Sequence, residues 1–232
     1  MGRSGHAKRL EPAGPELMEL NNEVSGKFRQ ARWEEFIYRF KGHDVELTSQ
    51  FISSFNNNFI TVNGLRFRVS EATIAEAIRA PMEGEKWFKN KPFHDIDLNM
   101  FLELEFYDPP WFVGIPCAFL LGVWNDVEVM ARQYFTFEGR YSGVHLYHMR
   151  FLVHIVGLKS MSLPFYLYKI LQKMVSRERN PQGIAPCSVF HQGLIKILFV
   201  HELQKSQASP GHSIGPRGRN PFPSRRRKNK SK

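Results

Sequence analysis

The sequence predicts a mainly α-helical globular body that contains one small β-hairpin near residues 59–69 and is followed by a disordered basic tail. Apolar residues recur at three- and four-residue intervals through much of the chain, which is the spacing of one buried helix face. An Asn-Gly pair between two short alternating segments indicates the hairpin. Nine of the ten excess positive charges lie in the last 28 residues, which contain no Asp or Glu. The chain therefore divides into a near-neutral body and a polycationic tail.

Length and composition favour one folded domain with flexible ends. The chain has 232 residues, of which 42% are hydrophobic and 20 are Phe, enough to bury a sizeable core. We expect a flexible N-terminal arm over 1–15, a mostly helical domain over 16–204 and a disordered tail over 205–232. The two cysteines, Cys117 and Cys187, are expected to be reduced thiols, because two cysteines cannot build a disulfide framework or a four-cysteine zinc cluster.

No segment favours membrane insertion or secretion. The longest apolar run, Ile115 to Trp124, is broken by Pro116 and Gly122 and is too short to cross a bilayer. The polar N-terminus lacks the apolar segment of a secretory signal. We therefore expect a soluble protein of the nucleus or the cytoplasm.

Three helices are expected before the hairpin. The first is expected near residues 16–23. The second is expected over about 30–40, where the large apolar residues share one helix face: Trp33, Phe36, Ile37 and Phe40. The third, over 45–55, follows the same helical spacing of apolar residues.

The hairpin is expected over residues 59–69, around Asn63-Gly64. Asn-Gly favours the type I′ turn because both central residues need a positive φ, and the twist of that turn matches the twist of the flanking strands. In the second strand, apolar residues alternate with Arg66 and Arg68. One face of the hairpin is therefore expected to be buried and the other to be basic.

A helix is expected directly after the hairpin. The Ser70 hydroxyl can accept a hydrogen bond from a backbone N–H of the first turn, so Ser70 is expected to cap a helix that runs to about Arg79. A loop over 81–92 follows. A further helix is expected over about 96–105, with Asp95 as its cap.

The second half of the chain is more strongly helical. Residues 115–135 are expected to hold one or two helices, the later one capped near Asn125 or Asp126. The glycine-containing segment 139–143 interrupts the chain. A helix over 144–156 follows, because its apolar residues again recur at helical spacing.

Two long helices complete the predicted body. The first begins at Leu163, with Pro164 in the first turn, where the missing N–H is not needed, and it runs to about Arg177. A linker is expected over 180–186. The last helix is expected over about 188–204.

The basic tail is the first candidate binding segment. Gly, Pro, Ser and Asn predominate around its charges, so it cannot bury enough apolar surface to fold. Compact cationic runs act as nuclear import signals or as arms that neutralise nucleic-acid phosphates with little sequence preference. A merely solubilising tail is the alternative. The candidate residues are Arg217, Arg219, Arg225, Arg226, Arg227, Lys228, Lys230 and Lys232.

A second candidate is a basic face on the first of the two long helices. Lys169, Lys173 and Arg177 are spaced four residues apart, so they share one side of that helix. Tyr166 and Tyr168 are close in sequence, and aromatic rings among basic residues suit a nucleic-acid surface. The alternative is an ordinary solvated helix face with tyrosines at the edge of the core.

The histidines and acids define no metal or catalytic site. His145 and His148 are three residues apart, but no third ligand stands at a recognisable spacing, so we predict no metal and no cofactor. The helix dipole explains the acids at expected helix starts, which are Asp95, Asp97, Asp126 and Glu128. A magnesium-dependent nuclease built on these acids is the enzymatic alternative. The main expectation is that the protein is not an enzyme.

Five segments occur in the order that characterises a known family: 33–36 (WEEF), 60–67 (ITVNGLRF), 84–87 (GEKW), 147–152 (YHMRFL) and 191–198 (HQGLIKIL). On these segments the chain resembles plant retrotransposon-associated proteins, the plant transposon protein family. The resemblance implies an element-derived protein with a mostly helical body and no assigned activity. It also implies a Gag-like or accessory role.

These observations lead to one main functional hypothesis. The chain is expected to be a non-enzymatic, transposon-derived binding protein. Its tail would contact nucleic acid or an import receptor, and its body would mediate protein contacts or self-association. A remnant nuclease or transposase is one alternative, and a plain protein-interaction module with a solubilising tail is another.

Overall fold

The computed structural model describes residues 22–40, 42, 44–88, 101, 115–116, 120–136, 143–144, 146–157, 160–179 and 189–208. This part of the chain is mainly helical, with one small antiparallel hairpin, which confirms the predicted fold class. In chain order the elements are α2 (Asn22–Gln30), α3 (Glu34–Arg39), α4 (Val45–Ser54), β1 (Phe59–Val62), β2 (Leu65–Arg68), α5 (Glu71–Ile78), β3 (Ile115–Pro116), α6 (Val123–Ala131), the π-helical turn η3 (Arg132–Thr136), β4 (Gly143–Val144), α7 (Leu146–Ile155), α8 (Leu163–Arg179) and α9 (Val189–Ala208).

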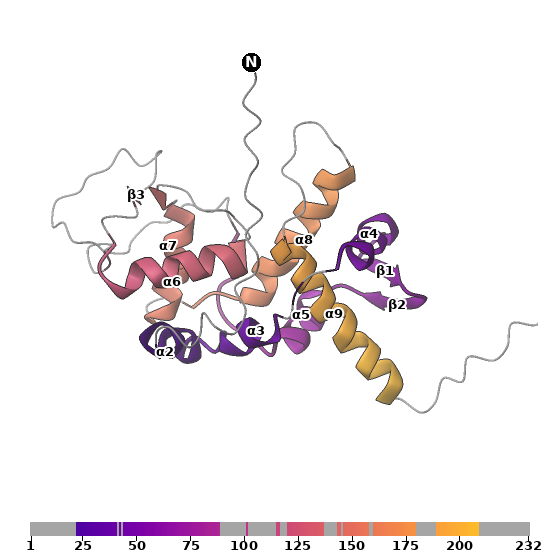
Figure 1. Cartoon of the computed structure of the whole chain (residues 1–232), viewed down its shortest axis with the longest axis horizontal. Coiled ribbons are helices and arrows are strands. Elements are labelled where there is room, and N and C mark those ends of the chain that lie inside the picture. The colour runs from indigo at the N-terminus through magenta and orange to yellow at the C-terminus, as the bar shows by residue number, and fades with distance from the viewer. Residues whose placement is uncertain are drawn as a thin grey trace, which may run out of the picture.

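Helix α8 connects two groups of elements (Figure 1). In the first group, α2, α6 and α7 pack against one another. In the second group, α4 lies against the hairpin and against α9, and α9 also packs on α5. Helix α8 contacts α4 and α5 of the second group and η3, which continues α6 of the first.

An aromatic cluster fills the centre of the body. The ring centroids of Trp33 and Phe135 lie 5.0 Å apart, and those of Phe135 and Phe151 lie 5.8 Å apart. Tyr166 continues the cluster 5.1 Å from Phe151, and Trp87 stacks on Tyr166 at 5.6 Å. All five side chains are buried. The five residues come from α7, α8, η3, the start of α3 and the segment after α5, so their contacts join these elements. Burying each aromatic side chain stabilises the fold by about 1.5–3 kcal/mol.

The first described helices differ from the prediction. The sequence predicts one helix over 30–40, whereas the chain forms α2 and α3 with a turn between them. In this turn Arg32 has a φ of 59°, and the Trp33 N–H donates to the carbonyl of Phe28 at 2.9 Å. The turn places Trp33 in the core. The helix predicted near 16–23 lies outside the described residues, except for its last two residues, which belong to α2.

The hairpin is confirmed. Strands β1 and β2 pair antiparallel, and the turn residues Asn63 and Gly64 have φ values of 47° and 79°, as a type I′ turn requires. Phe67 is buried, whereas Arg66 and Arg68 are exposed. The predicted division into a buried face and a basic face is therefore also confirmed.

Side-chain caps begin the helices on either side of the hairpin. As predicted, Ser70 Oγ accepts a hydrogen bond from the Thr73 N–H at 3.2 Å and caps α5. Asp44 caps α4 in the same way, because its carboxylate accepts from the Leu47 N–H at 2.9 Å. Helix α5 ends at Arg79, which adopts the left-handed conformation with a φ of 54°.

The region before α6 departs from the prediction. The sequence predicts helix from residue 115, but Ile115 and Pro116 form β3, which pairs antiparallel with β4. Pro116 lacks an N–H and holds the preceding residue in an extended conformation, which opposes a helix here. The partner strand β4 comes from a distant part of the chain, so no local sequence pattern predicts the pairing.

The predicted cap of α6 is wrong. Gly122 stands at the N-cap with a φ of 40°, and no side chain caps the helix. Asn125 and Asp126 lie inside its first turn instead. The predicted helix over 96–105 and the predicted linker over 180–186 lie outside the described residues, except for the buried Phe101.

The last three helices follow the predicted spans. Helix α7 ends before Gly157, whose φ of 78° suits a glycine after a helix. Helix α8 begins at Leu163 with Pro164 in its first turn. Helix α9 continues to Ala208, beyond the predicted end near Gln204.

A close contact joins α9 to the N-terminal helices. Gly193 in α9 is buried and faces the ring of Phe40, the residue that follows α3. A Cβ at position 193 would lie 2.0 Å from Cζ of Phe40. The absence of a side chain at this position therefore sets how closely α9 approaches Phe40.

Replacing Gly193 by Ala should lower the free energy of unfolding by about 1–3 kcal/mol, because the added methyl group displaces the buried Phe40 ring. Gly26 in α2 is the matched control, since a Cβ there meets nothing within 4 Å. Gly26→Ala should leave the stability unchanged or raise it by up to about 1 kcal/mol. Urea unfolding followed by circular dichroism measures both changes. Equal stability of the two variants would contradict this packing.

His154 in α7 is part of the core. Its ring stacks on Trp33, with centroids 4.2 Å apart and planes 6° apart, and its Nδ1 accepts a hydrogen bond from the Met161 N–H at 3.0 Å. The pKa of His154 is lowered from 6.5 to about 4, mainly by burial. A backbone hydrogen bond at Ala31 opposes this shift, and the charge of Arg150 contributes to it. The folded protein therefore holds His154 neutral at pH 7.

The unfolded chain binds a proton at His154 more readily than the folded protein does. The free energy of unfolding should therefore fall progressively as the pH decreases from 6.5 towards about 4. His154→Phe keeps an aromatic ring but has no titrating group. Over this pH range, the free energy of unfolding of the variant should therefore fall by about 1–3 kcal/mol less than that of the wild-type protein. The lost hydrogen bond to Met161 adds an offset that does not depend on pH. Urea unfolding at a series of pH values tests this, and parallel pH profiles for the two proteins would refute it.

A candidate polyanion-binding surface on helix α8

Helix α8 buries one face and leaves the other towards solvent. Its buried face includes Leu163, Tyr166, Leu167, Ile170, Leu171, Met174 and Val175. The outer face carries Phe165, Lys169 and Lys173 at four-residue spacing, so these side chains follow one another along the helix. Lys173 is exposed, and Phe165 and Lys169 are partly exposed.

The segment 81–88 is held beside the start of α8. The Ser162 N–H donates to the Glu85 carbonyl at 3.0 Å, and the Glu85 N–H donates to the Ser160 carbonyl at 3.1 Å. The Glu85 carboxylate also forms an ion pair with the buried Arg150 of α7. These contacts fix the segment to two helices.

Trp87 anchors the end of this segment. Its buried ring stacks on Tyr166 of α8, with the two planes 8° apart. The residues on either side of Trp87 lie nearer to solvent: Lys86 is exposed and Phe88 is partly exposed. The same burial that anchors Trp87 therefore brings a lysine and an aromatic ring next to the outer face of α8.

Two lysines share one ring on this face. The Nζ of Lys169 lies 5.6 Å from the centroid of Phe165 and 5.7 Å from that of Tyr168. The Nζ of Lys86 lies 5.7 Å from the centroid of the same Phe165 ring. A cation over a ring within about 6 Å is attracted by the negative face of the ring, by about 0.5–1 kcal/mol at exposed sites.

The third lysine extends this arrangement along α8. The Nζ of Lys173 lies 5.9 Å from the centroid of Phe88. Between these rings, the Gln172 amide donates to the Tyr168 hydroxyl at 2.8 Å, which fixes the orientation of that ring. We call the set the lysine–aromatic surface, and it comprises Lys86, Phe88, Phe165, Tyr168, Lys169 and Lys173.

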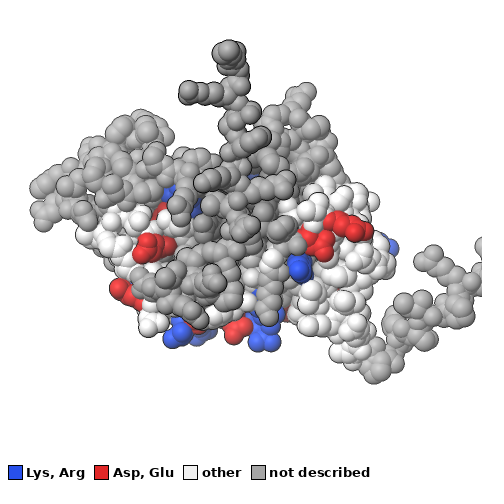
Figure 2. All heavy atoms as spheres, viewed as in Figure 1, with Lys and Arg blue, Asp and Glu red and all other residues white. Residues whose placement is uncertain are grey.

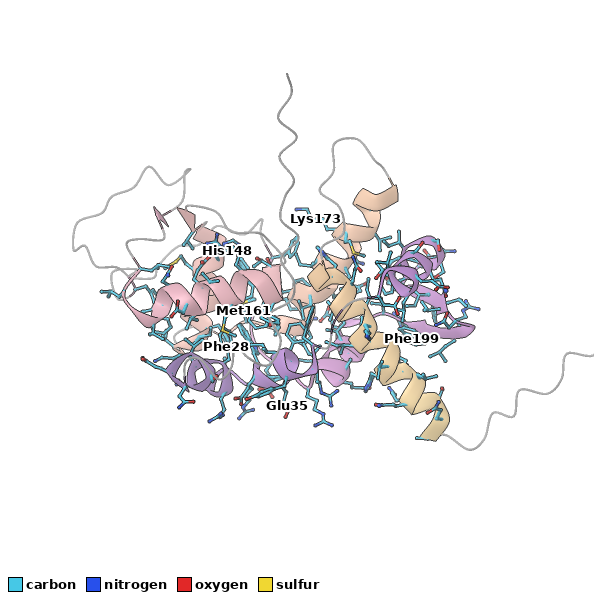
Figure 3. All side chains as sticks on the ribbon, in the orientation of Figure 1. Phe28, Glu35, His148, Met161, Lys173 and Phe199 are labelled. Carbon is cyan, nitrogen blue, oxygen red and sulfur yellow. The ribbon has the colours of Figure 1, made fainter. Side chains whose placement is uncertain are left out.

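Two of the three lysines have no ion pair with a carboxylate among the residues that the structure describes. Lys86 forms an ion pair with Glu71 at 2.7 Å. Lys169 donates instead to the neutral side chain of Gln172 at 3.3 Å, and Lys173 has its ring contact. In Figure 3, Lys173 lies by α8 in the upper part of the body and Glu35 lies at its lower side. The surface therefore keeps positive charge that an external anion can neutralise.

Charges at the α2–α3 edge are neutralised in a different way. Arg29 forms an ion pair with Glu34 at 2.9 Å, and Arg39 and Arg79 lie 3.8 and 3.7 Å from Glu35. Figure 2 shows basic and acidic side chains side by side along this lower edge. At this edge, Arg29, Arg39 and Arg79 therefore already have carboxylate partners from the chain itself.

The structure describes the side chains of two of the three residues of the predicted basic face. Lys169 and Lys173 share one side of α8, and Arg177 follows on the same helix, although its side chain lies outside the described residues. Tyr168 lies beside Lys169, as predicted. Tyr166 does not belong to the surface, because its position on the helix directs it into the aromatic core.

Sequence reasoning missed three members of the surface. Phe165 lies four residues before Lys169, so extending the same helical spacing backwards would have found it. Lys86 and Phe88 come from a segment far away in the sequence, and only the tertiary contacts with α8 bring them there. No local pattern predicts such a pairing.

The eight predicted tail residues lie outside the described residues: Arg217, Arg219, Arg225, Arg226, Arg227, Lys228, Lys230 and Lys232. Lys205, the first basic residue of the predicted tail, lies in α9 and donates to Glu76 Oε2 of α5 at 2.7 Å. This hydrogen bond, helped by a contact from His201, lowers the pKa of Glu76, and the same bond raises the pKa of Lys205. Residues 205–208 therefore belong to a helix and not to a disordered tail.

The residues around Lys205 have the composition of a metal site. The ligand atoms of Glu76, His201 and Glu202 lie within 4.8 Å of one another. However, the ammonium of Lys205 lies 2.7 Å from Glu76 and 3.6 Å from Glu202, so a cation of the chain itself already bridges the two carboxylates. We therefore interpret this group as a charge network that docks α9 on α5.

A buried charge pair lies in the other half of the body. The sequence predicts Glu128 at a helix start, but Glu128 lies in the second turn of α6 and is buried. The Nε of Arg132 donates to its Oε1 at 2.8 Å, and Nδ1 of His148 lies 3.5 Å from the same oxygen. The helix-dipole explanation of Glu128 is therefore wrong, and its partner is a buried arginine.

Of the remaining predicted acids and histidines, most lie outside the described residues. Asp126 lies exposed in the first turn of α6, where the helix dipole favours an acid. Asp95, Asp97 and His145 lie outside the described residues. The four acids of the enzymatic alternative are therefore not seen together.

Comparisons with protein families, curated proteins and solved structures find no match to this chain. Among the described helices, none is long and apolar enough to cross a membrane. The function must therefore be inferred from the residues themselves.

Removing one partner of the buried pair should be more damaging than removing both. Arg132→Met leaves the Glu128 carboxylate buried without its partner, so the free energy of unfolding should fall by about 3–5 kcal/mol. In the double variant Glu128→Leu with Arg132→Met, most of this loss should be recovered, because no charge remains to be desolvated. Urea unfolding of both variants measures the difference. A double variant that is less stable than the single one would contradict this account.

Proposed function

We propose that this chain is a non-enzymatic, transposon-derived binding protein that contacts nucleic acid without sequence preference. The lysine–aromatic surface of the body and the basic tail provide the contacts. Phosphates neutralise the lysine charges, and their binding releases counterions from the nucleic acid.

The charge of Lys169 and Lys173 is the observation that supports this proposal best. Neither lysine has an ion pair with a described carboxylate, whereas Arg29 and Arg39 at the α2–α3 edge are paired with glutamates. The segment 209–232 adds eight basic residues and no acid. A long polyanion can use both sets of charges at once, which strengthens binding without any new contact type.

The remaining parts of the proposal concern partners and origin. The tail also has the composition of a nuclear import signal, so an import receptor is its second proposed partner and the nucleus its proposed location. The body is proposed to mediate protein contacts or self-association. The resemblance to plant retrotransposon-associated proteins supports the proposed origin and a Gag-like or accessory role.

A salt series tests the nucleic-acid contacts. The logarithm of the binding constant should fall linearly with the logarithm of the salt concentration, by about 0.7–0.9 for each phosphate contact. Lys169→Gln with Lys173→Gln should reduce this slope by up to about 1.4–1.8, because two contacts are lost. Replacing Arg225, Arg226, Arg227 and Lys228 by Ser should reduce it further. Filter binding of the full chain to a mixed-sequence oligonucleotide measures all slopes.

The matched control removes two positive charges that also lie over rings elsewhere on the body. Lys27 lies 5.0 Å from the ring of Trp124, and Arg66 lies 5.2 Å from that of Phe59. Lys27→Gln with Arg66→Gln should leave the slope almost unchanged. Salt-insensitive retention of the wild-type chain would exclude the nucleic-acid role. An unchanged slope in the tail variant alone would assign the tail to import rather than to nucleic acid.

A further inference from the structure

We propose that the lysine–aromatic surface selects single-stranded over double-stranded nucleic acid, with bases stacking on Phe165 and Tyr168 while the neighbouring lysines bind phosphates. This inference rests on the proposed function and specifies its ligand. It goes beyond charge, because it assigns the binding preference to the rings.

The position of the lysines shows that the Phe165 ring is reachable from solvent. The ammonium groups of Lys86 and Lys169 both lie over this ring, at 5.7 and 5.6 Å, and a charged group stays hydrated. The ring itself is partly exposed, as is Tyr168. Long lysine side chains can shift their charge to a phosphate, and the ring face then accepts a base.

The surface combines the two features that single-strand binders use. Such proteins pair a positively charged path for the backbone with aromatic rings on which unstacked bases lie. Here Phe165, Lys169 and Lys173 follow one another over about 12 Å of helix, at a rise of 1.5 Å per residue. That length suits a contact with a few nucleotides.

A duplex can use only half of this surface. Its bases are stacked on one another and present only their edges in the grooves, so no base face can reach Phe165 or Tyr168. The lysines can still bind duplex phosphates. The rings should therefore add affinity for a single strand and almost none for a duplex.

The core holds these rings in place before any ligand binds. Tyr168 is fixed by the hydrogen bond from Gln172, and Phe165 neighbours Tyr166, which the stack with Trp87 locks into the core. Preorganised groups lose little entropy on binding. Elsewhere on the described body, cations over rings occur as single pairs, as with Arg66 over Phe59. The lysine–aromatic surface instead brings three lysines and three rings together.

The test compares single-stranded DNA, single-stranded RNA and a DNA duplex of the same mixed sequence, each carrying a fluorescent label. Fluorescence anisotropy measures the dissociation constants for the full-length chain. In Phe165→Leu with Tyr168→Leu, affinity for the single strands should fall about tenfold or more, since each stacked base contributes about 1–3 kcal/mol. Duplex affinity should change less than about twofold, and the salt slope should stay the same because no charge is removed.

Two control variants separate stacking from folding. Phe59→Leu removes an exposed ring with a cation over it, outside the surface, and should leave single-strand affinity unchanged. Tyr38→Leu removes an exposed ring of α3, also outside the surface, and should likewise leave single-strand affinity unchanged. If the Leu pair unfolds, the single-strand affinities of Phe165→Leu alone and of Tyr168→Leu alone decide the question.

The outcomes distinguish this inference from the proposed function. If the wild-type chain binds nucleic acid but the Leu variants lose single-strand and duplex affinity equally, or lose neither, the stacking surface is refuted while the nucleic-acid role stands. If the wild-type chain binds none of the three probes, both proposals fail. A selective loss for single strands, in DNA or RNA, supports the assignment of the rings.

Discussion

Aromatic packing at the centre of the body is the interaction on which the other features depend. Trp33, Phe135, Phe151, Tyr166 and Trp87 form an unbroken series of ring contacts, each between 5.0 and 5.8 Å. Their side chains come from five separate parts of the chain. Removal of this apolar area from water supplies the free energy that brings those parts together. The helices are then held by their shared core rather than by their individual propensities.

The same packing determines what the outer face of α8 presents. Burial of Tyr166 turns the positions of Phe165 and Lys169 towards solvent, because neighbouring residues of a helix point in different directions. Burial of Trp87 places Lys86 and Phe88 beside that face. A core contact and a candidate binding surface are therefore two sides of one arrangement. Arg29 and Arg39 at the α2–α3 edge, by contrast, form ion pairs with the neighbouring Glu34 and Glu35.

About half of the candidate surface could be predicted from the sequence. The four-residue spacing of Lys169 and Lys173 is a local property of one helix, and it correctly placed both on one side. The sequence shows only that Tyr166 and Tyr168 are close to these lysines; which of the two tyrosines faces the core depends on the packing of the helix. Lys86 and Phe88 could not be predicted, since they join the surface through contacts between segments that are far apart in the chain.

The sequence by itself determined the features that neighbouring residues control. These are the mainly helical composition, the type I′ turn at Asn63-Gly64, the Ser70 cap and the start of α8 at Leu163. The tertiary structure alone decided the contact of Trp33 with Phe135 in the core, the pairing of β3 with β4, and the docking of Lys205 on Glu76. The physical reason is range. Turns and caps depend on φ, ψ and hydrogen bonds within a few residues, whereas strand pairing, buried ion pairs and ring contacts depend on partners that the folded core alone brings together.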